Sequence, residues 1–362
     1  MTWNYGNLSA VHLELSTKCN AACPGCPRFL RNSPNVDPTL IQTEITLENF
    51  KKWFPVEITS KIFNWIVCGT HGDPVACKDL YEILQYICEN SSGNIQVNTN
   101  AGLKSPAYFK KIGELFNRDR SVKRVVTFSI DGLQDTNHIY RRNVKWHKAW
   151  ENMLSYKSTG AEAHWDFLQF DHNKHQIEEA KALAKKYDIN FILKNPFGVD
   201  GEAMPVYDKN YNLEYLIKNA HNPVENTYIP PDLGWEAGLP KQTTEEGHIE
   251  CMSFRNGDYP YHEMPITEIY VNALGRVHPC CFVGNKMQGP IYMEQSREMR
   301  VLQEKLGDSN SLNFFSLKEI LDSKVLDVYS NSWESKSIST CWLQCGKNAS
   351  KQRKIDILFV KE

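Results

Sequence analysis

The chain has 362 residues, of which 41% are apolar and 23% are charged, and its formal net charge at pH 7 is −2. These proportions indicate a folded soluble protein of about two domains, or one large barrel with an appendage. The near-neutral charge argues against nucleic acid as a partner, and no apolar run approaches the roughly 18 residues that span a membrane. The first residues, MTWNYGNLSA, lack a secretory signal, so we expect a cytoplasmic protein with reduced thiols.

Strand and helix patterns alternate over the first 200 residues. Short segments rich in β-branched and aromatic residues predict strands at residues 11–16, 63–69, 94–100, 124–131, 164–170 and 189–195. Amphipathic segments lie between them, the clearest at residues 173–188. Such repeats imply parallel strands with right-handed crossovers, whose C-terminal loops form the working face. We therefore predict an α/β fold for residues 1–200, as a twisted sheet or an incomplete barrel.

The rest of the chain has a different pattern. Residues 201–247 are rich in Pro, Gly and Asn with little periodicity, and we interpret them as a linker or covering segment. Residues 248–350 form a third section that contains a predicted hairpin with its turn at Asn272–Gly275. Residues 351–362 join a basic stretch to an apolar one, which predicts a docked tail or a strand.

The eleven cysteines fall into three sets. Single cysteines in apolar or helical contexts, typical of buried structural thiols, are Cys68, Cys77 and Cys88. A second set in the last third comprises Cys251, Cys280, Cys281, Cys341 and Cys345. The third set follows the first predicted strand, in the stretch STKCNAACPGCPR, and comprises Cys19, Cys23 and Cys26.

The opening triplet of cysteines predicts a metal centre. Thiolates are soft ligands that suit zinc, copper(I) or iron–sulfur clusters. A structural zinc site needs a fourth ligand, and none follows within the loop. A cubane cluster held by three cysteines instead leaves one iron open, where a small molecule can bind. The triplet alone leaves zinc and an open cluster as alternatives.

The C-x3-C-x2-C spacing after a first strand, at the head of a strand–helix series, resembles the radical S-adenosylmethionine (SAM, or AdoMet) superfamily. The resemblance implies a partial (β/α)6 TIM-type barrel in which Cys19, Cys23 and Cys26 hold a [4Fe–4S] cluster. The open iron of such a cluster binds the amino and carboxylate groups of SAM, and one electron cleaves SAM to a 5′-deoxyadenosyl radical that removes a substrate hydrogen. One departure is Gly25, because the family usually has an aromatic residue there, near the adenine.

Further stretches resemble the SAM-binding elements of the same superfamily. CGTHGDP matches the Gly-Gly-Glu element that receives the SAM amino group, at His71, Gly72 and Asp73. NTNAG resembles the Thr-Asn-Gly end of the third strand, at Thr99 and Asn100. SIDGLQDTNHIYRR implies that Ser129 bonds the ribose and that Arg142, or Arg141, binds the SAM carboxylate.

The second cysteine set resembles the auxiliary-cluster extension called SPASM, or its shorter relative called twitch. The number of thiols permits one auxiliary [4Fe–4S] cluster, held by Cys251, Cys280, Cys341 and Cys345 in a small cysteine-rich α+β domain. Cys281 is either the spare thiol or the ligand in place of Cys280. The alternative for this set is structural zinc.

These resemblances imply an enzyme of oxidoreductase type that abstracts hydrogen from a peptide or protein side chain, in an oxidation or cross-linking modification. An electron donor such as flavodoxin or ferredoxin would be its partner. The alternatives are a radical SAM dehydrogenase of a small alcohol and a non-catalytic zinc-binding scaffold. No catalytic acid or base is assigned; Asp131, Asp166 and Lys194 are candidates near strand ends.

Overall fold

The computed structural model describes residues 2–30, 33–196, 203–220, 266–287 and 294–335, together with 249, 251, 253–255, 338, 340–341, 345 and 357–359. Within these residues, no helix is long and apolar enough to cross a membrane.

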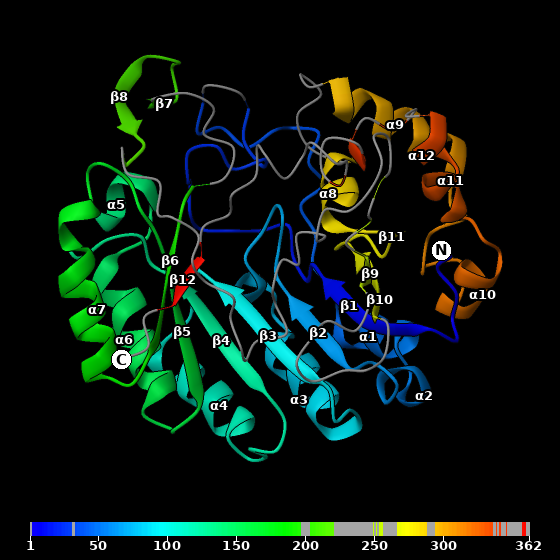
Figure 1. Ribbon diagram of the computed structural model, residues 1–362, viewed down its shortest axis with the longest axis horizontal. Helices are drawn as coiled ribbons and strands as arrows, with labels where there is room; N and C mark the ends of the chain where they lie inside the picture. The colour runs from blue at the N-terminus through cyan, green and yellow to red at the C-terminus, as the bar shows by residue number, and fades with distance from the viewer. Residues whose placement is uncertain are drawn as a thin grey trace.

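Six parallel strands form the centre of the molecule, and each pairs with the next along the chain (Figure 1). They are β1 (Leu8–Leu13), β2 (Asn64–Val67), β3 (Asn94–Thr99), β4 (Arg124–Ser129), β5 (Glu162–Leu168) and β6 (Asn190–Lys194). All the predicted strands are confirmed, although β1 begins and ends three residues before its predicted bounds. The curved, mostly parallel sheet is consistent with the expected partial barrel.

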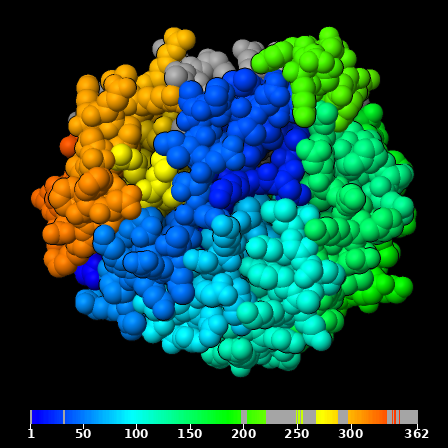
Figure 2. Space-filling view, turned by 180° about the vertical axis from the view of Figure 1, so that it is seen from behind, coloured from blue at the N-terminus to red at the C-terminus, as the bar shows by residue number. Residues whose placement is uncertain are grey.

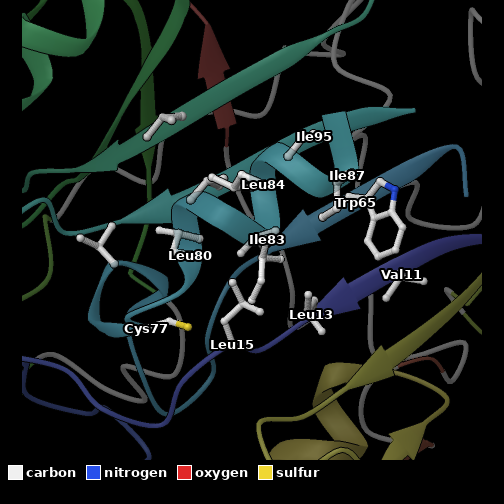
Figure 3. Packing of buried hydrophobic residues seen from close by; sticks show 14 of the residues in the cluster. Val11, Leu13, Leu15, Trp65, Cys77, Leu80, Ile83, Leu84, Ile87 and Ile95 are labelled. Carbon is white, nitrogen blue, oxygen red and sulfur yellow. The ribbon is translucent and has the colours of Figure 1, made fainter. Parts of the chain in front are cut away.

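Helices on the outer side of the sheet connect these strands (Figure 1). They are α1 (Leu47–Trp53), α2 (Val56–Thr59), α3 (Leu80–Asn90), α4 (Pro106–Phe116), α5 (Asn137–Tyr140), α6 (Trp146–Lys157) and α7 (Ile177–Lys186), with short 3-10 turns η1 (Pro74–Ala76) and η2 (Lys174–Gln176). Figure 3 shows Leu13 and Trp65 of the sheet facing Ile83 and Ile87 of α3. Since side chains alternate along a strand, the neighbours of these apolar residues, such as His12, lie on the inner face.

The C-terminal third extends the sheet beyond β1. Strand β10 (Ile266–Val271) pairs in parallel with β1, and β11 (Val277–His278) and β9 (Phe254–Arg255) pair antiparallel with β10. The predicted hairpin turn is confirmed, since the Gly275 nitrogen donates to the Asn272 oxygen at 2.9 Å. Further helices lie at this end of the sheet (Figure 1): α8 (Cys281–Gly284), η3 (Asn285–Met287), α9 (Glu294–Leu306), α10 (Leu317–Asp322), α11 (Asp327–Ser330) and α12 (Ser332–Ser335).

The opposite edge of the sheet is covered by the chain's last strand. β12 (Ile357–Phe359) pairs antiparallel with β6, in agreement with the strand or docked tail expected there.

A separate hairpin, β7 (Ala203–Tyr207) and β8 (Leu213–Lys218), forms where sequence patterns indicated only a linker or covering segment. It packs Val206 and Ile217 against Phe170 in a small second core. In Figure 2 the hairpin lies beside the segment between β1 and α1, and Asn35 Nδ2 of that segment donates to Lys209 O at 3.2 Å. This hairpin, which is the described part of residues 201–247, also lies over the loop that carries the cysteine triplet, since a Cβ on Gly25 would lie 3.2 Å from Met204 Sδ.

The β10–β11 turn makes a specific contact with the barrel, which a glycine substitution tests. Gly275 has φ +75°, and a Cβ on it would lie 2.6 Å from the Trp53 indole. We expect Gly275→Ala to lower the free energy of unfolding by about 3 kcal/mol, because it combines backbone strain with a clash. Gly307 has φ +55° with nothing within 4 Å of a new Cβ, so Gly307→Ala should cost only about 1 kcal/mol. Equal costs in urea unfolding would refute the packing of this turn on α1.

Candidate functional site

The structure brings the three opening cysteines together in the loop after β1. The Cys26 nitrogen donates to Cys23 O at 3.2 Å, and the turn between them uses Gly25 at φ +77°. Burial, with smaller contributions from the charges of Asp73 and Cys23 at Cys19 and of Cys23 at Cys26, raises the pKa of Cys19 and of Cys26 to about 12. Three thiols that influence one another in this way form a cradle for a soft metal centre.

Positive and polar groups face the sulfur atoms of this triplet. Asn100 Nδ2 lies 3.4 Å from Cys19 Sγ, and Arg141 Nη1 lies 3.8 Å from Cys23 Sγ. The Arg141 guanidinium is held by Asp131, with Nε 2.5 Å from Oδ2. Donors of this kind stabilise thiolates and suit the ligands of an iron–sulfur cluster.

The described residues contain no three His, Cys, Asp or Glu side chains that converge on one position for a single ion. A cubane does not need such a point, because each of its thiolates binds a different iron. The three thiols of this loop are therefore kept as candidate ligands of such a cluster.

The loop Gly69–Asp73 packs directly on the segment that leads into the triplet. The Asp73 nitrogen donates to Lys18 O at 2.9 Å, and a Cβ on Gly72 would lie 2.0 Å from Ser16 O. Only glycine fits at this close approach. The predicted SAM-binding loop therefore lies beside the cysteines.

Asp73 joins this loop to the end of β3. Its Oδ1 accepts from Val75 N at 2.9 Å and Thr99 Oγ1 at 2.8 Å, and its Oδ2 accepts from Asn100 N at 2.8 Å and Thr99 Oγ1 at 3.1 Å. Burial raises the pKa of Asp73, and these hydrogen bonds oppose that rise. Because a carboxylate has about four acceptor positions, Asp73 is engaged by the protein on both oxygens. It holds Asn100, which in turn donates to Cys19.

The remaining predicted SAM contacts lie at the same end of the barrel. Ser129 ends β4 and pairs in register with Asp166 of β5. Of the two arginines considered for the SAM carboxylate, Arg142 is bound to the β7–β8 hairpin, at 3.0 Å from Tyr207 O and 2.8 Å from Glu214. Arg141 is the one that faces the cysteine triplet.

The second cysteine set also assembles. Cys251, Cys280, Cys341 and Cys345 line one pocket together with the aromatic side chains of Trp3, Tyr329 and Trp333. Burial raises the pKa of Cys280 strongly, and the charges of Cys281 first and then of Cys251, Cys345 and Cys341 also raise it. Cys281 is absent from this lining; burial raises its pKa, and the charges of Glu268 and Cys68 add to that effect. The arrangement groups Cys280, and not Cys281, with the other three thiols.

Two important residues were not identified from the sequence. Arg28 is buried and donates from Nη1 to Thr17 O at 2.7 Å and to His71 O at 2.9 Å, which fastens the triplet loop to the Gly69–Asp73 loop. Glu14 is fully buried behind the same loop. The only local signals were a basic residue directly after the triplet and an acidic residue within the apolar stretch VHLELS.

Comparisons with known proteins agree with the architecture. No protein-family model matches the sequence, and no curated protein matches it. Among solved structures, native anSMEcpe with bound AdoMet has a TM-score of 0.51 at 14% identity, over 94% of this chain and 88% of that chain. The chain therefore shares the fold of an AdoMet-bound protein.

Two further solved structures have lower TM-scores. SuiB of Streptococcus suis bound to S-adenosylmethionine has a TM-score of 0.48 at 14% identity, over 76% of this chain and 61% of SuiB. BtrN in complex with AdoMet and 2-DOIA has a TM-score of 0.42 at 11% identity, over 90% of this chain and 87% of BtrN. The chain thus spans about three fifths of the length of SuiB.

The buried carboxylate of Asp73 yields a stability test of the site. In Asp73→Asn, an amide NH2 replaces one oxygen and leaves a buried N–H group without an acceptor, so we expect a loss of about 2 kcal/mol. Asp119 accepts similar bonds from Ser121, but at the exposed surface. Asp119→Asn should therefore lower the free energy of unfolding clearly less in the same urea measurement. A loss for Asp73→Asn no larger than for Asp119→Asn would contradict the anchoring of this loop.

Proposed function

We propose that the chain is a radical SAM enzyme. The observation that carries the proposal is the cradle of three thiols beside the loop Gly69–Asp73, at the C-terminal ends of parallel barrel strands. Cys19, Cys23 and Cys26 would hold a [4Fe–4S] cluster with one open iron, and AdoMet would bind there. The AdoMet bound to anSMEcpe, which has the same fold, supports this assignment.

When bound, the cluster supplies the electron that cleaves AdoMet reductively and yields a 5′-deoxyadenosyl radical. The protein's part is to bind and orient. The backbone carbonyls of the loop Gly69–Gly72 would receive the amino group, because the Asp73 carboxylate already accepts from three donors, those of Val75, Thr99 and Asn100. Arg141, with donors left after its contacts to Asp131 and Cys23, is the better candidate for the carboxylate than Arg142.

The second cysteine set would hold one auxiliary [4Fe–4S] cluster of SPASM or twitch type. Its proposed ligands are Cys251, Cys280, Cys341 and Cys345, which share one buried pocket. Four thiolates close a cluster to AdoMet, so its role would be electron transfer or support of the fold. Acceptance of an electron from a substrate radical would make the net reaction an oxidation.

Two polar groups on the inner face of the barrel support the proposal that the substrate is a peptide. Lys194 Nζ lies 2.5 Å from Asp166 Oδ2, while the buried Asp166 Oδ1 has no hydrogen-bond partner among the described residues. A donor and an acceptor placed side by side match the C=O and N–H groups of an amide. A small alcohol is the second candidate, because hydroxyl groups can use the same pair.

Reconstitution tests the proposed chemistry. Anaerobic loading with iron and sulfide should give a brown protein with about eight irons per chain if both clusters form. Under reduction, the wild type should convert AdoMet to 5′-deoxyadenosine, measured by chromatography. Cys26→Ala should abolish this product, because it removes a ligand of the cluster that binds AdoMet. Cys341→Ala should still form part of the 5′-deoxyadenosine, because Cys341 belongs to the second cysteine set.

Cys88→Ala is the matched control, since this helix thiol belongs to neither cysteine set, and it should keep full iron content. A colourless protein that holds only zinc would refute the enzyme and support the zinc scaffold.

Isotope transfer tests the substrate class. With deuterated candidates, label should appear in 5′-deoxyadenosine from a peptide and not from a cyclitol, as measured by mass spectrometry. Lys194→Ala should lower kcat/KM for the peptide about tenfold, because one charged hydrogen bond to the substrate is lost. Lys181 lies on the outer helix α7 and pairs with Glu178 at the surface, so Lys181→Ala should leave kcat/KM unchanged. Label transfer from the cyclitol alone would favour the alcohol dehydrogenase.

A further inference from the structure

A buried carboxylate lies behind the proposed AdoMet loop. Glu14 Oε1 accepts hydrogen bonds from Thr70 N at 2.8 Å, His71 N at 2.6 Å and Thr70 Oγ1 at 3.1 Å. Burial alone would raise the pKa of Glu14, but the hydrogen bonds and the contact with His71 outweigh it and lower the pKa to about 2. The carboxylate is therefore ionised at neutral pH and is a strong acceptor for the loop.

The other oxygen of Glu14 is bound by the C-terminal third of the chain. The Tyr270 hydroxyl on β10 donates to Oε2 at 2.8 Å, across 256 positions of sequence, and lies 2.9 Å from Thr70 Oγ1. The Tyr270 ring is fully buried, and a Cβ on Gly284 of α8 would lie 2.4 Å from it. The His12 ring also packs against the Tyr270 ring in an edge-to-face arrangement, with the two ring centroids 5.1 Å apart, and this packing fixes the position of the hydroxyl.

The two backbone bonds to Glu14 also orient the loop's carbonyl groups. In a trans peptide the N–H and the preceding C=O lie in one plane and point in opposite directions. When the nitrogens of Thr70 and His71 point at Glu14, the carbonyls of Gly69 and Thr70 point away from it. These carbonyls belong to the stretch that would receive the AdoMet amino group.

We infer that Glu14 and Tyr270 are positioning residues, an inference that rests on the proposed function. They hold the Gly69 and Thr70 carbonyls in the orientation that binds the AdoMet ammonium group. Tyr270 thereby makes AdoMet affinity depend on β10, whose hairpin leads through β11 to Cys280. Neither residue touches the reacting atoms. Their effect is on binding and not on the bond cleavage itself.

The test is AdoMet binding to the reconstituted full-length protein without reductant, measured by isothermal titration calorimetry. Tyr270→Phe keeps the ring and removes the hydroxyl, so iron content should match the wild type while the Kd for AdoMet rises about fivefold. The KM for AdoMet should rise in parallel, with kcat at saturation unchanged within twofold. Tyr156→Phe is the control, because Tyr156 also loses a buried bond, to Glu162 O at 3.0 Å, far from the loop.

A second pair of variants addresses the same contact without touching the buried ring. Thr70→Val removes the hydroxyl that contacts Glu14 and Tyr270 and should weaken AdoMet binding, whereas Thr70→Ser keeps it and should restore the affinity. A Kd within twofold of the wild type for both Tyr270→Phe and Thr70→Val would overturn the inference. Absence of saturable AdoMet binding to the wild type would instead refute the proposed function, and with it this role for Glu14.

Discussion

The arrangement of the site depends on one buried carboxylate, that of Asp73. It lies in the loop after β2, its own nitrogen is bound to Lys18 before the triplet, and its oxygens bind Thr99 and Asn100 at the end of β3. A buried carboxylate must find hydrogen-bond donors for its oxygens, or its desolvation costs several kcal/mol of stability. Asp73 meets this requirement by fixing three strand ends relative to one another, and the sulfur of Cys19 is placed as a result.

A second constraint comes from the edge of the sheet. Strand β1 carries the cysteine loop, and an unpaired edge there would leave a row of backbone groups without partners. The chain supplies β10 for this edge, and the same strand delivers Tyr270 to Glu14. The C-terminal third is therefore part of the barrel's structure as well as the carrier of the second cysteine set. The β10–β11 hairpin serves both roles, because it carries Tyr270 and leads to Cys280.

Local patterns were sufficient to predict much of this architecture. The parallel strands and the turn at Asn272–Gly275 depend on short-range composition and periodicity, and the structure has each of them. The pairing of β10 with β1 depends on residues more than 250 positions apart, for which one sequence gives no local signal. One sequence also gives no local signal for choosing between the adjacent residues Arg141 and Arg142. Arg142 is bound to Glu214 of the β7–β8 hairpin, whereas Arg141 is left to face Cys23. The hairpin itself was missed because its strands are short and interrupted by Pro205.

The inner face of the barrel has a chemical character that packing alone does not explain. Strands covered on both sides are usually near-continuous apolar runs, and the outer positions of these strands follow that rule, with Val97, Phe128 and Trp165 in the core. Many of the alternate positions are polar, among them Gln96, Asn98, Thr127, His164 and Asp166, although Ile66, Val125 and Ile192 also lie there. Burial of such groups lowers stability unless a partner meets them, and the free oxygen of Asp166 lacks one among the described residues. This wall supports the proposed polar substrate, which would complete the hydrogen bonds of Asp166 at the barrel mouth.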